Sequence, residues 1–270
     1  MFPSLAILFG FGCLTGVTTV LFGFGGGFLT VPAVFAVVAA TDGADAMHTA
    51  VATSTAVMVV NALSATVAQA RAGRLRREYV FPLALFVGIG AFLGAVAAGH
   101  VSDTALHLLF IGYLVITLVD NVIRRGFVTG TDPASAPRPL SRTTSTVGGV
   151  GIGAVAAFLG VGGSVLTVPL LRRSGLPMAE AAALANPLSV PVALVGTLAY
   201  ALAAPPITAP GYLGQVDLVA AAALLCGSVP TIALARRLPR RIPDRVHAIG
   251  YLGFLGLVLI AMVVMVFVRI

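Results

Sequence analysis

The stretch Gly23-Phe-Gly-Gly-Gly-Phe-Leu-Thr-Val-Pro32 decides the fold of this chain, because it occurs twice. The second copy, Gly160-Val-Gly-Gly-Ser-Val-Leu-Thr-Val-Pro169, begins 137 residues later and is identical at seven of the ten positions. Glycine carries an entropic cost in a helix and proline lacks a backbone N–H, so each copy interrupts any helix that contains it. In an apolar chain, interrupted backbone survives only where other protein covers it or where it lines a water-filled cavity. The repeat therefore predicts two broken membrane segments that face one buried site.

The composition is typical of an integral membrane protein. Of the 270 residues, 59% are hydrophobic and only 9% are charged, whereas charged residues make up about a quarter of a soluble domain. The formal net charge of +7 comes from sixteen arginines, which cluster in short loops beside apolar spans. Such clustering indicates the orientation of membrane helices. Basic surface interleaved with aromatic residues, which a nucleic-acid-binding protein needs, is missing, so we expect no nucleic-acid partner.

Apolar runs of about 20 residues, the length that crosses a bilayer as a helix, predict four full membrane helices in each half of the chain. The predicted helices cover residues 3–22, 46–70, 79–99 and 103–124, and then 143–159, 178–203, 215–236 and 244–268. Between the first two helices of each half lies a glycine element with its apolar tail, at residues 25–40 and 162–173. We therefore predict an all-α membrane protein with about eight full transmembrane helices and two broken glycine-rich segments.

The halves read as two transmembrane repeats, residues 1–125 and 143–270, joined by a polar, proline-rich linker at residues 126–142. The repeat extends weakly beyond the glycine elements. The further correspondences are Ala52-Thr53-Ser54 with Ala185-Asn186-Pro187, Gly90 with Gly227, and Asp103 with Asp244.

The arginines predict how the repeats are oriented. If the tails of the glycine elements do not cross the membrane, the linker and the arginine-rich loop 236–245 fall on opposite sides, which breaks the positive-inside tendency. If each tail crosses as a short broken segment, fifteen of the sixteen arginines share one face and only Arg269 is misplaced, while Asp42, Asp45 and Asp103 fall on the opposite face. Each half then crosses five times, so the halves insert with opposite orientations. We predict an inverted-topology repeat with a cytoplasmic linker and both termini outside, as in secondary transporters with a site near the midplane.

The glycine elements are the candidate binding site. Free N–H groups at a broken helix, together with the positive end of the next half-helix dipole, hold an anion without a cationic side chain. The alternative is that the glycines only allow close helix packing, but two copies at corresponding positions favour a site. Neighbouring hydroxyl and amide groups, including that of Ser189, would add donors. The candidate substrate-binding residues are Gly25, Gly26, Gly27, Thr30, Thr53, Ser54, Gly162, Gly163, Ser164, Thr167 and Asn186.

Titratable groups are scarce in the predicted spans, and no arginine, lysine or carboxylate lies near the middle of one. Asp120 lies one turn from the inner end of its helix, and we expect a local ion pair with Arg124 rather than a proton relay. A histidine could titrate and couple transport to protons, but interfacial placement is the simpler interpretation. The four histidines are His48, His100, His107 and His247.

The sequence does not favour an enzyme. Cys13 and Cys226 both lie inside apolar spans and show neither a disulfide framework nor metal-binding spacing. Catalysis inside a membrane needs carboxylate, histidine or metal clusters at a shared depth, whereas the nine acidic residues are scattered over helix ends and loops. We therefore expect no catalytic residues, no metal and no cofactor.

On its two glycine elements, Gly23–Pro32 with the pattern G-x-G-G-G-x-x-x-x-P and its counterpart Gly160–Pro169, the chain resembles the sulfite exporter TauE/SafE family, also called the 4-toluene sulfonate uptake permeases. The resemblance covers essentially the whole chain. The second element departs from the pattern at Ser164, and Asn186-Pro187 stands where family members often have a Gly-Thr-Ser-like run. The resemblance implies transport of small sulfur-containing anions, such as sulfite or organosulfonates, across the bacterial inner membrane.

Together these observations predict a multi-pass secondary transporter, an exporter of small sulfur-containing anions, whose partners are its substrate and the lipid bilayer. An anion channel and an uptake permease of the same fold are the alternatives. Small-residue helix faces would also allow a homodimer, although such faces serve internal packing as well.

Overall fold

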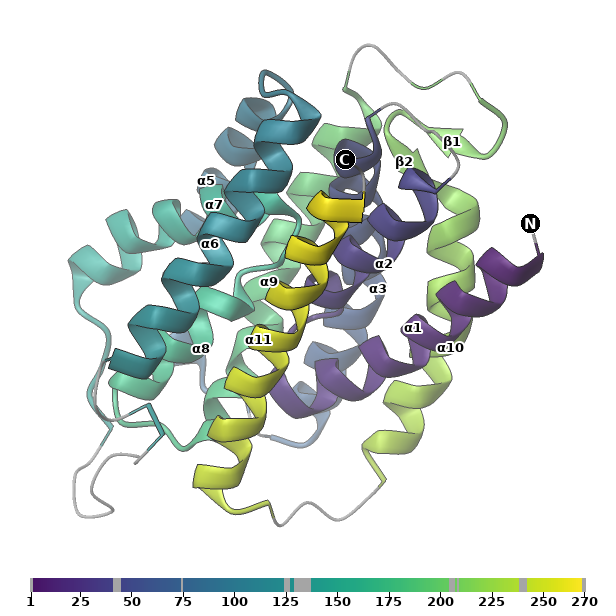
Figure 1. Cartoon of the computed structure of the whole chain (residues 1–270). Coiled ribbons are helices and arrows are strands. Elements are labelled where there is room, and N and C mark those ends of the chain that lie inside the picture. Colours follow the sequence, from purple (N-terminus) through teal and green to yellow (C-terminus); the bar gives the residue numbers. More distant parts are fainter. Residues whose placement is uncertain are drawn as a thin grey trace.

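The computed structural model describes residues 2–40, 45–73, 75–123, 127–128, 137–203, 207, 209–237 and 242–268. These residues form a bundle of helices with one short β-hairpin (Figure 1). Among them, seven helices are long and apolar enough to cross a membrane, and two shorter apolar helices, Gly27–Ala39 and Thr144–Leu159, accompany these seven. The predicted all-α membrane fold is confirmed, but the described residues hold seven full spans and not about eight, because the helix predicted at residues 143–159 is one of the two shorter ones. Asp42, Arg124, Arg269 and most of the predicted linker lie outside the described residues.

The first half follows the predicted order of helices, with one additional break. Phe81 has an extended backbone and separates a single helical turn from the helix that begins at Leu83. Proline cannot donate a backbone hydrogen bond and disfavours helical geometry in the residue before it, so Pro82 explains this break. The elements are α1 (Phe2–Phe22), α2 (Gly27–Ala39), α3 (Ala46–Arg71), α4 (Arg77–Val80), α5 (Leu83–Ala98) and α6 (Asp103–Ile123).

The second half contains a hairpin that the sequence did not predict. The helix expected from residue 215 begins instead at Leu218, because the side chain of Asp217 accepts hydrogen bonds from the N–H groups of Val219 and Ala220, both at 2.9 Å, and so caps the helix. The elements are η1 (Thr144–Gly148), α7 (Gly149–Leu159), α8 (Ser164–Arg173), α9 (Met178–Ala201), β1 (Tyr212–Leu213), β2 (Val216–Asp217), α10 (Leu218–Ala235) and α11 (Asp244–Val268).

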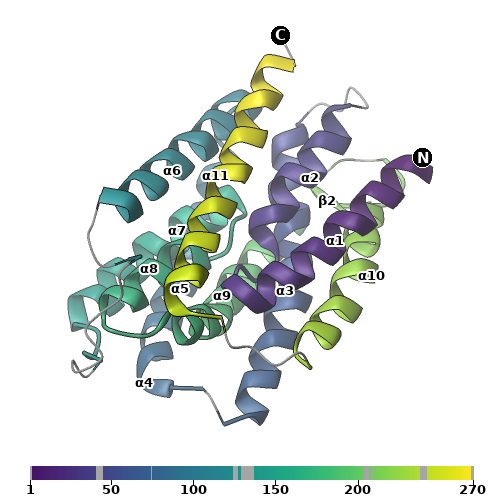
Figure 2. The same ribbon diagram turned by 60° about the horizontal axis from the view of Figure 1, so that its bottom comes forward.

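The helices of one half pack against those of the other. α1 lies along α10, α5 along α7, α3 along α9 and α6 along α11 (Figure 1, Figure 2). Glycines let two of these pairs touch backbone to backbone: a Cβ on Gly90 would overlap the carbonyl oxygen of Val150, and a Cβ on Gly227 would overlap that of Phe9. Gly90 and Gly227 are a pair that the sequence aligned. Backbone contacts at corresponding glycines are what two related halves would make. The inverted orientation of the halves and their bounds, residues 1–125 and 143–270, stay predictions.

Two aspartates hold the beginnings of α3 and α9. Asp103, at the start of α6, accepts hydrogen bonds from the N–H groups of Met47 at 2.6 Å and His48 at 3.1 Å. Asp244, at the start of α11, accepts one from the N–H of Met178 at 2.6 Å. A carboxylate at a helix N-terminus satisfies N–H groups that have no partner within the helix and suits the helix dipole. The two aspartates that the sequence aligned therefore have corresponding structural roles.

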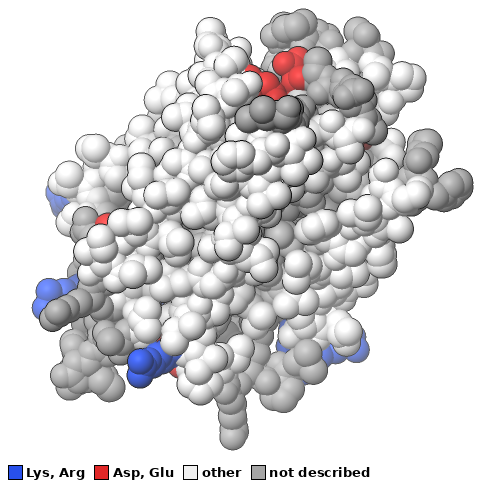
Figure 3. Space-filling model, viewed as in Figure 1, with Lys and Arg blue, Asp and Glu red and all other residues white. Residues whose placement is uncertain are grey.

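Arginines gather at one end of the molecule. Figure 3 shows them along the lower and left edges of this face and acidic side chains at its upper end. Arg172, which is only 3% exposed, pairs with Asp244 and donates to the carbonyl oxygens of Phe127 at 3.0 Å and Leu176 at 3.4 Å. His247, in the first turn of α11, donates to the carbonyl oxygen of Leu21 in the last turn of α1 at 2.6 Å. α1 therefore ends where α11 begins, at the arginine-rich end.

Asp120 makes an ion pair that the sequence did not predict. It pairs with Arg173, the last residue of α8. The predicted partner, Arg124, lies outside the described residues. Spacing along one helix could not reveal a partner that lies on another element.

We expect the substitution Asp244→Ala to lower the free energy of unfolding by about 2–4 kcal/mol. The nearly buried Arg172 would keep its charge without a carboxylate, and the start of α9 would lose its cap. Thermal unfolding of the detergent-purified protein measures the effect.

The matched control is Glu180→Ala, which removes an ion pair between Glu180 and Arg76. The charged atoms of this pair lie 3.7 Å apart, and the side chains of Arg76 and Glu180 are 43% and 49% exposed. Exposed pairs contribute at most about 1 kcal/mol. Equal melting temperatures for the two variants would contradict the role assigned to Asp244.

Candidate functional site

The two glycine elements lie against each other inside the bundle. A Cβ on Gly27 would come within 2.8 Å of the carbonyl oxygen of Gly160, and a Cβ on Gly162 within 3.6 Å of that of Phe24. The hydroxyl of Ser54, on α3, lies 2.8 Å from the carbonyl oxygen of Gly27 and 2.6 Å from that of Gly160, so it donates to the backbone of both elements. One side chain of α3 thus joins the two breaks.

The half-helices that follow the two elements begin together and end far apart. α2 starts at Gly27 and leads towards the start of α3, which rests on Asp103 in the first turn of α6. α8 starts at Ser164 and ends at Arg173, which pairs with Asp120 in the last turn of α6. Because α6 has 21 residues and a helix of that length spans about 31 Å, α2 and α8 run to opposite ends of the bundle. The positive ends of both helix dipoles therefore meet at the glycine elements.

Two glycines of the site are required by the backbone and by their neighbours. Gly26 has a φ of +94° and Gly162 a φ of +70°, in the left-handed region that favours glycine. A Cβ on Gly26 would overlap the side-chain nitrogen of Asn61, and a Cβ on Gly162 would lie 2.6 Å from the sulfur of Met58. At Gly163 the φ is −67°, and a Cβ would meet nothing closer than 3.6 Å. Gly163 is therefore a predicted site residue whose position also has room for alanine.

Three of the predicted polar side chains are engaged with the backbone. Besides Ser54, Thr30 donates to the carbonyl oxygen of Gly26 at 2.7 Å, within its own helix. Thr53 accepts a hydrogen bond from the N–H of Asp217 at 3.0 Å and so contacts the hairpin. These hydroxyls hold the scaffold around the glycine elements.

The other three predicted polar side chains each carry a buried polar atom that has no hydrogen-bond partner among the described residues. These atoms are Ser164 Oγ, Thr167 Oγ1 and Asn186 Oδ1. Their residues are 0%, 0% and 2% exposed. Leaving a buried polar group unpaired costs about 1–3 kcal/mol, and native proteins keep such groups mainly where a ligand, an ion or water completes them. The second glycine element and α9 thus supply unfilled hydrogen-bonding capacity.

Polar residues from α1 and α3 that the sequence analysis missed complete this region. Asn61 accepts a hydrogen bond from the hydroxyl of Ser228 at 2.9 Å, whereas Asn61 Nδ2 and Thr15 Oγ1 have no partner in the described part of the chain. Both side chains face Gly26. The missed signal was an amide in the middle of an apolar span, because a polar group at that depth is costly unless it faces the bundle interior.

Met58 and Ser189 occupy the space between the two elements. The sulfur of Met58 lies near the positions that Cβ atoms on Gly27 and Gly162 would take, at 3.1 and 2.6 Å. Ser189, which the sequence analysis mentioned as an additional hydroxyl, lies beside Gly25 and Gly162 and donates to the carbonyl oxygen of Ala185 at 3.0 Å. No sequence signal distinguished Met58 from an ordinary core methionine.

Asp45, His48 and Asp103 come within 4.8 Å of one another, an arrangement that a metal ion could use. However, the two ring nitrogens of His48 face acceptors: Nδ1 lies 3.3 Å from a carboxylate oxygen of Asp103, and Nε2 lies 3.1 Å from the carbonyl oxygen of Ala98. Both nitrogens therefore donate, and neither offers a lone pair to a metal. In this arrangement His48 is the cationic partner of Asp103, as Arg172 is of Asp244.

The other histidines also have structural partners. A ring nitrogen of each lies within hydrogen-bonding distance of a backbone carbonyl oxygen, at 2.9 Å for His100, 3.1 Å for His107 and 2.6 Å for His247. These contacts fit the simpler interpretation of the histidines as helix-end and packing residues.

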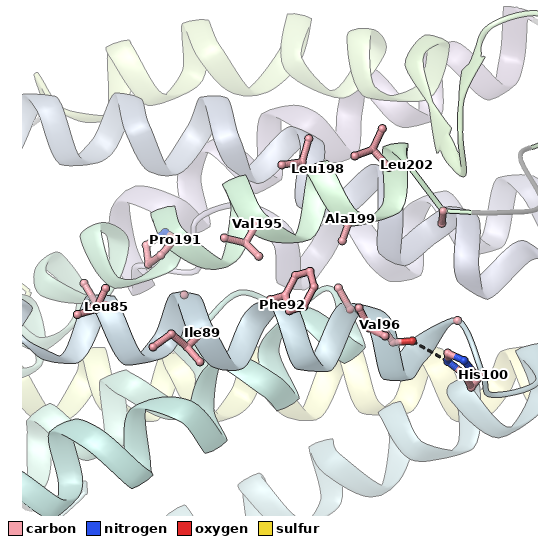
Figure 4. A pocket seen from close by; sticks show the side chains of 15 residues that line it. Leu85, Ile89, Phe92, Val96, His100, Pro191, Val195, Leu198, Ala199 and Leu202 are labelled. Carbon is pink, nitrogen blue, oxygen red and sulfur yellow. Dashed lines mark hydrogen bonds between the residues drawn. The ribbon is translucent and has the colours of Figure 1, made fainter.

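A wide surface groove lies away from the glycine elements. It has a volume of about 900 Å³ and runs between α5 and α9 (Figure 4). Its walls are apolar and include Phe92 and Leu198, which are 56% and 62% exposed on the side of the bundle. None of the eleven predicted site residues lines this groove. An anion there would lose its hydration without gaining donors, which is unfavourable.

Comparison with known proteins gives one family and one relative. The family model named "Sulfite exporter TauE/SafE" matches residues 8–262. A protein of Haemophilus influenzae named "Probable membrane transporter protein" is 26% identical to this chain over 186 residues, which cover 67% of each chain. No solved structure gives a significant match.

Adjacent glycines of the second element provide a matched pair of substitutions. We expect Gly162→Ala to destabilise the protein by about 1–3 kcal/mol, because alanine is strained at a positive φ and its Cβ would press on Met58. Gly163→Ala should stay within about 0.5 kcal/mol of the parent, since its Cβ has room. Thermal unfolding of both variants measures the difference, and equal losses would refute the backbone geometry assigned to this element.

Proposed function

The chain belongs to the sulfite exporter TauE/SafE family, and on this premise we propose that it is a secondary transporter that exports small sulfur-containing anions, such as sulfite or organosulfonates. The observation that carries the proposal is the meeting of two half-helix N-termini beside buried hydroxyl and amide groups without partners. Two converging positive dipole ends attract an anion and repel a cation at this junction.

The chemistry of the site suits an oxyanion. Such an anion presents several oxygen acceptors in different directions, so it needs donors that approach from more than one side. N–H groups at the starts of α2 and α8 approach along opposite helix directions, and each helix start acts as roughly half a positive charge. The hydroxyls of Ser164 and Thr167 and the amide nitrogen of Asn61 add neutral donors. The first glycine element thus works together with the second.

The same arrangement supports alternating access. α3 and α9 pack along each other and carry Ser54, Met58 and Ser189 to the junction of the glycine elements. Because α2 and α8 leave that junction towards opposite ends of the bundle, rocking one half against the other would open the junction first to one side and then to the other. Met58 lies in the space between the elements, and its flexible, unbranched side chain can move aside at low cost.

We place the arginine-rich end, with the linker 126–142, in the cytoplasm of a bacterial inner membrane, following the positive-inside tendency. Both termini then lie outside, and the family name supports export over uptake. A homodimer stays a prediction from the small-residue helix faces.

The hydroxyl of Thr167 provides a direct assay of the site. Thr167→Val keeps the shape of the side chain but removes a donor that has no partner among the described residues. Hydrogen bonds to charged groups contribute about 1.5–3 kcal/mol, so we expect sulfite flux into proteoliposomes to fall roughly tenfold to a hundredfold at low substrate concentration.

The control is Thr55→Val, because the hydroxyl of Thr55 is also buried but donates to the carbonyl oxygen of Ala52 at 2.7 Å. This variant should transport at close to the parental rate. A Thr167→Val protein that melts at the parental temperature and transports at the parental rate would remove Thr167 from the site.

We also expect a selective ligand shift. Sulfite, sulfate, thiosulfate, sulfoacetate, taurine and chloride would each be added to the purified protein, and the melting temperature would be measured. A ligand that binds only the folded state stabilises that state more as its concentration exceeds its Kd. One sulfur oxyanion or sulfonate should therefore raise the melting temperature. Thr167→Val should reduce this shift. If none of these anions changes the melting temperature of the folded protein, the anion site is contradicted. In the flux assay, a rate that does not saturate with substrate concentration would favour a channel.

A further inference from the structure

A second groove opens on the side of the bundle between α3 and α10, at the arginine-rich end. It has a volume of about 550 Å³ and combines apolar walls, one hydroxyl and two guanidinium groups. Its lining residues are Leu63, Ser64, Val67, Ala68, Arg71 and Arg236.

The groove runs along the end of α3. Its α3 residues recur at intervals of three and four, so they share one helix face, and Leu63 to Arg71 spans about 12 Å of helix. Leu63 and Val67 are 37% and 45% exposed, although both are apolar. In a membrane protein, such a lateral face meets lipid acyl chains. The distance corresponds to the outer part of one leaflet, where the headgroup and the beginning of an acyl chain lie.

The two charged residues of the groove stand at the ends of the helices that form it. Arg71 is the last residue of α3, and Arg236 directly follows the last residue of α10. Neither forms an ion pair within the portion of the chain that the structure describes. Partial burial lowers the pKa of Arg236 from its ordinary value. Two neighbouring guanidinium groups without a carboxylate favour an anionic ligand between them.

We propose that this groove binds one anionic phospholipid. Its phosphodiester lies between Arg71 and Arg236, where guanidinium groups can donate paired hydrogen bonds to phosphate oxygens. Its glycerol esters lie near Ser64, and the first part of an acyl chain covers Leu63 and Val67. Basic pockets between membrane helices at the cytoplasmic side recognise anionic headgroups in this way.

Both halves of the groove are needed for this assignment. A free phosphate ion would pair with the arginines but leave the apolar wall uncovered. A neutral phospholipid would cover the wall but bring no net charge to the arginines. The larger groove between α5 and α9 shows the contrast. His100 is the only titratable residue among the described residues that line it, and none of these residues is a fixed cation for a headgroup.

The position of the lipid links it to the rest of the bundle. α10 packs against α3, and α3 carries Ser54 and Met58 at the glycine elements. A phospholipid that joins Arg71 to Arg236 therefore connects the ends of two helices from different halves.

The experiment uses the full chain, purified in a neutral detergent and free of added lipid. Native mass spectrometry and thermal unfolding would compare phosphatidylglycerol and cardiolipin with phosphatidylcholine, and with glycerol 3-phosphate as a soluble headgroup. We expect retained adducts and a raised melting temperature with the two anionic lipids only. Arg71→Gln combined with Arg236→Gln should weaken phosphatidylglycerol binding roughly tenfold or more.

The matched control combines Arg142→Gln with Arg245→Gln. These substitutions remove the same charge from two exposed positions outside the groove, one just before η1 and one in the first turn of α11. Equal weakening by both double variants would reduce the effect to diffuse attraction and overturn the site. An equal shift with phosphatidylcholine or with glycerol 3-phosphate would also overturn it. Ala68→Phe, which fills the groove without changing its charge, should weaken lipid binding as well, and unchanged binding in that variant would contradict the proposed pose.

Discussion

Backbone N–H and carbonyl groups that lack partners cannot face lipid, and this constraint organises the whole molecule. Each half of the chain contains one interrupted stretch, and each stretch is covered by the other. Ser54 donates to carbonyl oxygens of both elements, and Gly27 and Gly162 allow the backbones to approach closely. Because the two breaks cover one another, the fold needs both halves. The covered space between them is the substrate site that we propose, where polar backbone is available inside the membrane.

The ends of the half-helices are fixed by a related device with different chemistry in each half. Asp103 and Asp244 both cap the helix that follows a half-helix. The cation beside Asp103 is His48, which can lose its proton, whereas the cation beside Asp244 is Arg172, which cannot. Both halves thus have a carboxylate at corresponding positions, but its cationic partner can be neutralised in the first half and is always charged in the second. This difference distinguishes the two ends of the bundle chemically even though their backbone contacts are alike.

The sequence predicted the features that depend on local chemistry. Apolar length defined the membrane helices, and the conformational cost of glycine and proline located the two breaks, so the fold class and the meeting of the glycine elements followed from short stretches. Features that depend on distant partners were missed. The ion pair of Asp120 with Arg173 joins residues 53 positions apart, and the place of Met58 between the elements depends on how α3 packs. Asn61 was detectable in principle as an amide in an apolar span, but its neighbour Ser228 lies 167 positions away.

The second glycine element has a serine where the first has a glycine, and this difference changes which hydrogen-bond donors each element offers. Gly27 begins α2 without a side chain, whereas Ser164 begins α8 with a hydroxyl that has no partner among the described residues. The hydroxyl of Thr30 donates to the carbonyl oxygen of Gly26, whereas the hydroxyl of its counterpart Thr167 has no partner within the described part of the chain. The first element therefore contributes mainly backbone and a helix dipole, and the second adds side-chain donors. In the site that we propose, the second element therefore offers more side-chain donors than the first. A bound oxyanion would for this reason have a preferred orientation between α2 and α8.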